Sequence, residues 1–109
     1  MTLRSQLLKG ILEGCILATI NHQTTYGYEL SLKLKENGLT DVSEGSIYPI
    51  LLRLQKEKLI TGEMKKSDTG PKRKYYTLTS DGELALKQFN HQWERIKFPV
   101  DKIMHKGEK

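Results

Sequence analysis

The stretch VSEGSIYPILLRLQKEK, residues 42–58, decides the fold, because it predicts one short helix with two different faces. Ser43 is a good N-cap, since its hydroxyl can accept a hydrogen bond from an amide of the first turn. Glu44 then places a negative charge at the positive end of the helix dipole. Apolar residues at spacings of four and three predict a buried stripe on a helix over residues 43–58, formed by Ile47, Leu51 and Leu54.

The opposite face of this helix carries a hydroxyl, a phenol, a proline and cations: Ser46, Tyr48, Pro49, Arg53 and Lys56. Small polar groups and a ring can reach base edges or sugars in a nucleic-acid groove, while cations can reach phosphates. This face therefore favours nucleic-acid binding. An ordinary amphipathic helix with a solvated face is the alternative interpretation, and the helix alone does not decide between them.

Composition sets the class of protein. The 109 residues predict one domain, and a hydrophobic content of 37% predicts a modest core that a dimer interface would supplement. The net charge of +5 favours an anionic partner such as nucleic acid or a membrane surface. The single cysteine excludes an intramolecular disulfide. No apolar run approaches the roughly 20 residues of a membrane span, and the start lacks the apolar region of a signal peptide, so we expect a reduced, cytoplasmic protein.

Two further helices are predicted before residue 42. The first, over residues 5–21, has a broad apolar stripe, part of which could face a partner subunit: Leu7, Leu8, Ile11, Leu12, Cys15, Ile16 and Ile20. Cys15 is interpreted as a small core residue, since no cation lies within a helical turn to activate its thiol. The second helix, over residues 26–37, is expected to start at a Thr24 or Thr25 cap and to end at Asn37-Gly38, with core positions Tyr28, Leu30 and Leu34. Followed by a short turn and the helix over residues 43–58, it predicts a helix-turn-helix.

A basic hairpin is predicted next. Residues 59–66 and 72–78 form two candidate strands, joined by a turn cluster over residues 67–71. Three helices followed by a hairpin is the order of a winged helix. Residues 65–74 hold five cations against Asp68 alone, a net charge of +4, namely Lys65, Lys66, Lys72, Arg73 and Lys74. Gly70-Pro71 would let this backbone approach a surface while the cations follow phosphates; an exposed, merely soluble loop is the alternative.

The last helix is predicted to begin at a Thr79 or Ser80 cap, with Glu83 completing a capping box with Ser80. Its apolar residues follow heptad spacing: Leu86, Phe89, Trp93, Ile96, Val100 and Ile103. Such a narrow stripe on a terminal helix favours a dimerisation seam over a purely intramolecular role. Pro99 predicts that the helix kinks or stops near Phe98, with a new start at Val100 as one outcome, and residues 104–109 are expected to form a frayed tail.

Together these segments resemble the PadR family of bacterial winged-helix transcriptional regulators, in its short form with a single C-terminal helix. The resemblance runs from Leu7 to about Trp93. Its most specific parts are Ser43-Glu44-Gly45-Ser46-Ile47-Tyr48-Pro49 with Leu54, and Gly70-Pro71-Lys72-Arg73-Lys74-Tyr75-Tyr76 with Leu78-Thr79 and Gly82. Leu8-Lys9-Gly10 and Tyr26-Gly27-Tyr28-Glu29-Leu30 also fit.

The resemblance implies a mainly α fold with a small β-hairpin wing, in which residues 1–78 form a winged helix-turn-helix and residues 79–109 a dimerisation helix and tail. It implies a homodimer on a partly palindromic double-stranded DNA operator, usually acting as a repressor. The recognition helix would contact DNA through Ser46, Tyr48, Pro49 and Arg53, and the wing through Lys72, Arg73 and Lys74. The charge pattern adds Lys56, Lys65 and Lys66 to these contacts, and the close approach of the backbone at Gly70-Pro71 adds Gly70.

The same resemblance implies that the first and last helices form the dimer, through Leu8, Ile11, Leu12, Leu86, Phe89, Trp93, Ile96 and Val100. In some short members an aromatic residue of the last helix lines an apolar pocket at the dimer interface, where planar drugs bind. Trp93 falls near that position and is the candidate for an effector pocket. A core or seam aromatic is the alternative role for Trp93.

Other functions are less consistent with the chain. His22, His91 and His105 fall in no metal-binding spacing, and the glycines form no phosphate-binding loop, so we expect no metal, no cofactor and no catalysis. RNA modules typically use an aromatic sheet or a GXXG loop, which the sequence lacks. A winged-helix protein-interaction module without direct DNA binding is the remaining alternative, and the basic hairpin argues against it.

Overall fold

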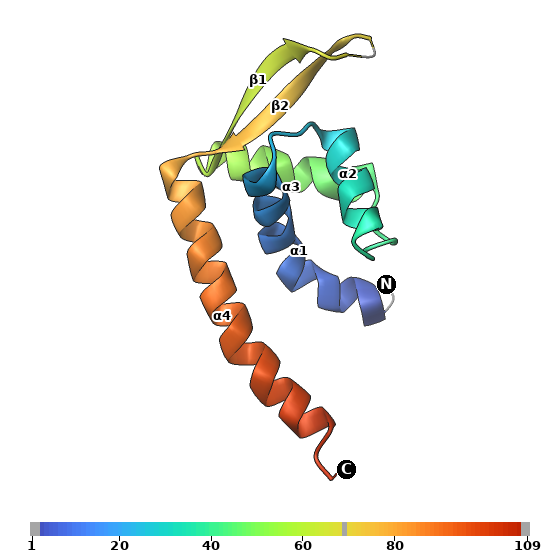
Figure 1. Cartoon of the computed structure of the whole chain (residues 1–109), viewed down its shortest axis with the longest axis vertical. Coiled ribbons are helices and arrows are strands. Elements are labelled where there is room, and N and C mark those ends of the chain that lie inside the picture. The colour runs from blue at the N-terminus through green and yellow to red at the C-terminus, as the bar shows by residue number, and fades with distance from the viewer. Residues whose placement is uncertain (1–2, 69, 108–109) are drawn as a thin grey trace.

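A computed structural model describes residues 3–68 and 70–107 of the chain. Its elements follow the order α1 (Leu3–His22), α2 (Gly27–Glu36), α3 (Glu44–Lys56), β1 (Ile60–Lys66), β2 (Lys72–Leu78) and α4 (Ser80–Met104). Figure 1 shows α1, α2 and α3 gathered into one body, with the hairpin projecting from it and α4 running away from it. The predicted winged helix with one additional C-terminal helix is therefore confirmed.

The core lies where the three N-terminal helices meet the base of the hairpin. The predicted stripe of α3 is buried, as are Leu30 and Leu34 of α2 and Ile60 of β1. Tyr28 was expected in this core, but its side chain is 45% exposed, because it lies on the face of α2 opposite Leu30 and Leu34. Leu7 is likewise exposed, so the apolar stripe of α1 is buried mainly in its C-terminal half.

Helix starts follow the predicted caps at two places and differ at the third. The Ser43 hydroxyl accepts from the amide of Ser46, and the Thr79 hydroxyl accepts from the amide of Gly82. Because Ser80 is the first residue of α4 rather than its cap, it does not form the predicted capping box with Glu83. The predicted cap of α2 is also wrong: Tyr26 is the N-cap, and it makes no side-chain capping bond.

Thr25 has another role, because it is fully buried and ties α2 to the hairpin. Its hydroxyl donates to Oε1 of Glu29 at 2.7 Å, and its carbonyl accepts from the amide of Tyr76 at 2.8 Å. The two strands pair antiparallel with Ile60 opposite Leu78 and Lys66 opposite Lys72. The base of the wing is therefore bonded to the chain just before α2.

Helix α4 runs through Pro99 to Met104, so of the two outcomes predicted at Pro99, a kink or a stop near Phe98, the stop does not occur. Its first turns pack closely on the body: a Cβ added at Gly82 would overlap the carbonyl oxygen of Leu59. Residues 105–107 form a turn, and residues 108 and 109 of the expected tail lie outside the described residues. Among the helices described, none is both long and apolar enough to cross a membrane.

Candidate nucleic-acid interface

The surface of α3 that faces solvent is a stripe at spacings of four, three and four, directly opposite the buried stripe. It consists of Gly45, Pro49, Leu52 and Lys56, all exposed. We call these four residues the outer stripe. It contains two of the predicted DNA contacts, Pro49 and Lys56, together with Leu52, whose side chain is 68% exposed. A solvent-exposed helix face of this kind can enter the major groove of DNA.

Tyr48 lies on the edge of α3 that faces α2 and β2. Its ring packs against Gly27 at the start of α2, and its hydroxyl donates to Oε2 of Glu44 at 3.1 Å. Partial burial, followed by the bond to the Glu44 carboxylate, raises the pKa of Tyr48, although nearby Arg73 lowers it slightly. The phenol therefore stays protonated and neutral near neutral pH.

Ser46 and Arg53 lie on the other edge of α3, toward α1, and line a groove of about 390 Å³ there. Arg53 donates from Nη2 to Oε2 of Glu13 at 3.1 Å and from Nη1 to Oε2 of Glu57 at 3.4 Å. These carboxylates, Glu13 most of all, raise the pKa of the Arg53 guanidinium above its ordinary value. The structure thus places Ser46 and Arg53 apart from Tyr48, with the outer stripe between the two edges.

The wing carries its cations on both faces, because neighbouring residues of a strand point in opposite directions. Lys65 pairs with Arg73 across the strands, whereas Lys66 pairs with Lys72 near the tip. Lys65, Lys66 and Lys72 are exposed, as is Gly70, whose φ of +152° requires a residue without a side chain. The outer part of the wing is therefore the open, positively charged end of the molecule.

Arg73 and Lys74 lie closer to the body and are only partly exposed. The Arg73 guanidinium lies 5.0 Å from the centroid of the Tyr26 ring, which in turn meets the Tyr75 ring edge-on at 5.3 Å. Lys74 Nζ lies 5.9 Å from the Tyr76 ring centroid, and its stem covers Gly62. Aromatic rings thus hold the inner cations of the wing in place.

Three residues of this surface were not predicted as DNA contacts from the sequence, namely Gly45, Leu52 and Tyr26. Leu52 continues the spacing from Pro49 to Lys56, so the sequence places it on this face. Only polar and charged residues and proline were predicted to contact DNA there, which leaves an apolar side chain out. Tyr26 gave no such signal, because its position under Arg73 depends on how α2 meets the hairpin.

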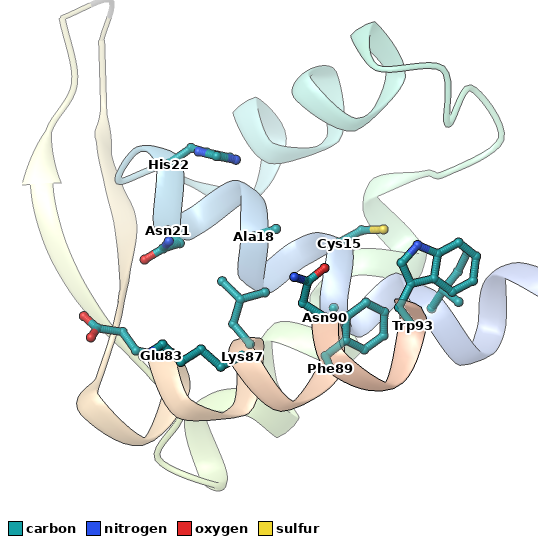
Figure 2. A pocket seen from close by; sticks show the side chains of 12 residues that line it. Cys15, Ala18, Asn21, His22, Glu83, Lys87, Phe89, Asn90 and Trp93 are labelled. Carbon is teal, nitrogen blue, oxygen red and sulfur yellow. The ribbon is translucent and has the colours of Figure 1, made fainter. Parts of the chain in front are cut away.

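A second groove of about 670 Å³ lies between α1 and α4. Figure 2 shows Phe89 and Trp93 projecting from α4 toward Cys15 and Ala18 of α1, with Asn90 beside them and Glu83 and Lys87 nearer the other end. Phe89 packs on Gly14, where a Cβ would overlap its ring. Burial raises the pKa of the Cys15 thiol, which agrees with the predicted unreactive role. Trp93, the predicted effector residue, therefore lines a real concave surface.

The residues predicted for the dimer interface fall into three groups. Leu12 is only 7% exposed and belongs to the core of the protomer, while Leu8 and Leu86 pack partly against that core. Ile11, Phe89 and Trp93 line the α1–α4 groove. Farther along α4 the heptad stripe is open, with Ile96 and Val100 both exposed, as are Phe98, Ile103 and Met104.

Comparison with known proteins gives a consistent result. The sequence profile of the transcriptional regulator PadR-like family matches residues 16–88. The chain is similar to a PadR-like transcriptional regulator from Bacillus cereus, at 54% identity and a TM-score of 0.86, covering 94% of this chain and 99% of that one. A Streptococcus transcriptional regulator is similar at 43% identity and a TM-score of 0.83, over 91% and 97% of the two chains. Bacillus subtilis PadR in complex with operator DNA shares 30% identity at a TM-score of 0.64, over 72% of this chain and 46% of that one.

Proposed function

We propose that this chain, which belongs to the PadR-like family of transcriptional regulators, binds double-stranded DNA in a sequence-specific manner as a homodimer and represses transcription. Helix α3 would enter the major groove, and the wing would lie along the flanking phosphates or minor groove. The observation that carries this proposal is the open outer stripe of α3, held beside a wing segment with a net charge of +4. The operator complex of the related Bacillus subtilis PadR supports it.

The proposed DNA contacts differ in how they would act. Lys56, Lys65, Lys66, Lys72, Arg73 and Lys74 supply sequence-independent attraction to phosphates, which salt weakens through counterion release. Gly70 lets the wing backbone approach the DNA. Sequence would be read along the outer stripe, which contains Pro49 and is flanked by Ser46, Tyr48 and Arg53. Of these, Arg53 can also reach a flanking phosphate.

The homodimer is proposed from the exposed apolar part of α4. Ile96 is 54% exposed and Ile103 67% exposed, and a second copy would cover this surface. Two-fold symmetry would then place two recognition helices about one helical turn of DNA, roughly 34 Å, apart. Replacing both isoleucines with glutamate should give a monomer in sedimentation analysis and abolish tight operator binding while leaving the fold intact.

A small planar apolar effector is proposed for the α1–α4 groove. Its lining combines the Trp93 and Phe89 rings with the polar ends of Asn90 and Glu83, which suits a ligand with an aromatic body and a polar edge. In a dimer, the two winged-helix units can be arranged so that they contact both half-sites or so that they cannot. Such a ligand releases DNA only if it binds the second arrangement more tightly than the first. Quenching of Trp93 fluorescence would report its binding.

The direct test is fluorescence anisotropy with the DNA upstream of the protein's own gene, at several salt concentrations, against a scrambled duplex. Tight, salt-sensitive and selective binding supports a sequence-specific regulator. Equal binding to both duplexes would mean that the operator lies elsewhere. Absence of binding to either duplex at low salt would reject the DNA-binding proposal in favour of a protein-interaction module.

A further inference from the structure

Leu52 occupies the centre of the outer stripe without a packing role that would explain it. Its neighbours Leu51 and Leu54 fill the core, whereas the Leu52 side chain is 68% exposed on the opposite face. Pro49 and Gly45 precede it on the same stripe, and both are exposed. The middle of the proposed reading surface is therefore aliphatic rather than polar.

Three polar side chains on the edges of this surface are already paired within the protomer. The Ser46 hydroxyl lies 3.1 Å from the Ser43 hydroxyl, and the Tyr48 hydroxyl donates to Glu44. Arg53 is held by Glu13 and Glu57. Direct readout by bidentate hydrogen bonds requires free Arg, Lys, Asn or Gln groups at base edges, and the central positions Pro49 and Leu52 offer none.

The major groove displays one apolar group that such a surface can recognise, the C5-methyl group of thymine. We propose that Leu52 is a specificity-determining residue that selects thymine in each half-site by packing against this methyl group. The inference rests on the proposed DNA-binding function and adds the base that α3 recognises. It predicts that part of the specificity depends on a methyl group rather than on a hydrogen bond.

The experiment uses the full chain and a duplex selected by it from a random library. Each thymine of the selected duplex is replaced in turn by uracil, which removes the methyl group and keeps the same hydrogen-bonding edge. For wild type, uracil should weaken binding by about fourfold at one thymine or more in each half-site, which corresponds to the burial of one methyl-sized group. In L52A the same replacement should change binding by less than about 1.5-fold.

The control variant is L84A, which removes an exposed leucine from α4 and should keep the full uracil effect. The inference would be overturned if wild type bound the selected duplex equally well with uracil at every thymine position. It would also be overturned if uracil weakened the binding of L52A as much as that of wild type. If the library yields no enriched sequence, the proposed function itself fails and this inference with it. Circular dichroism of L52A and L84A confirms that both fold, as expected for exposed helical positions.

Discussion

Arg53 of α3 donates to Glu13 of α1 across 3.1 Å, and this ion pair joins the proposed reading helix to the helix that forms one wall of the α1–α4 groove. Glu13 directly precedes the pair Gly14-Cys15, which lines that groove. The positive charge of Arg53, which is proposed to contact DNA, is therefore already balanced by the Glu13 carboxylate of α1.

Replacing Glu13 with glutamine should strengthen DNA binding, because it frees Arg53 for phosphate and removes a negative charge near the DNA. Both side chains are partly exposed, so the pair contributes about 0.2–1 kcal/mol and the gain should reach at most about fivefold at low salt. Anisotropy titrations check it. E94Q, which breaks a similar ion pair with Lys97 on α4, controls for the change in net charge. Equal gains in both variants would show that Arg53 plays no part.

Replacing Arg73 with alanine should weaken binding to operator and scrambled DNA alike and flatten the salt slope by about one phosphate contact. The variant should also lose the stacking on Tyr26, at a cost of about 0.5–1 kcal/mol in unfolding free energy. K72A, at the exposed end of the wing, should show the binding effect without the loss of stability. An unchanged salt slope in R73A would remove Arg73 from the interface.

Replacing Tyr48 with alanine should reduce operator binding about tenfold and scrambled-duplex binding much less, because the ring lies beside the outer stripe. Y48F keeps the ring on Gly27 and removes only the hydroxyl, which donates a hydrogen bond to Glu44. We therefore expect Y48F to stay within about threefold of wild type. Parallel losses on both duplexes in Y48A would contradict a reading role.

Gly82→Ala should destabilise the protein by about 1–3 kcal/mol, because the added methyl group would overlap the backbone carbonyl of Leu59, which cannot move freely. Gly10→Ala is the matched control, since nothing lies within 4 Å of its Cβ and alanine favours a helix. Urea unfolding should show G10A unchanged or more stable. A neutral G82A would mean that α4 can shift relative to β1.

The Cys15 thiol should react slowly with iodoacetamide at pH 8, because burial raises its pKa and lowers the fraction of thiolate in the folded state. Since the folded pKa lies above the unfolded one, this group also reduces stability as pH rises past the unfolded pKa, near 8.5. Native protein should label several times more slowly than protein in urea. Equal rates would contradict burial of the thiol.

Local signals in the sequence predicted the elements well, because each is encoded by neighbouring residues. Each of these signals spans only a few positions of the sequence. Examples are the Ser43 cap, the heptad spacing in α4 and the turn cluster at residues 67–71. What depended on tertiary packing was missed: Thr25 turned out to bond the hairpin rather than to cap α2, and Tyr28 proved exposed. The pairing of Arg53 with Glu13 joins residues 40 positions apart, a separation that no local pattern reveals.

Pro99 has a consequence for the length of DNA that a dimer could span. Its ring nitrogen cannot donate to the carbonyl of Arg95, so the outer turns of α4 are joined to the inner turns by one hydrogen bond fewer than usual. In a dimer joined through α4, a small bend at this point would change the distance between the two winged-helix units. We therefore expect the protein to tolerate operators whose half-site spacing differs by a base pair, and P99A to narrow that tolerance.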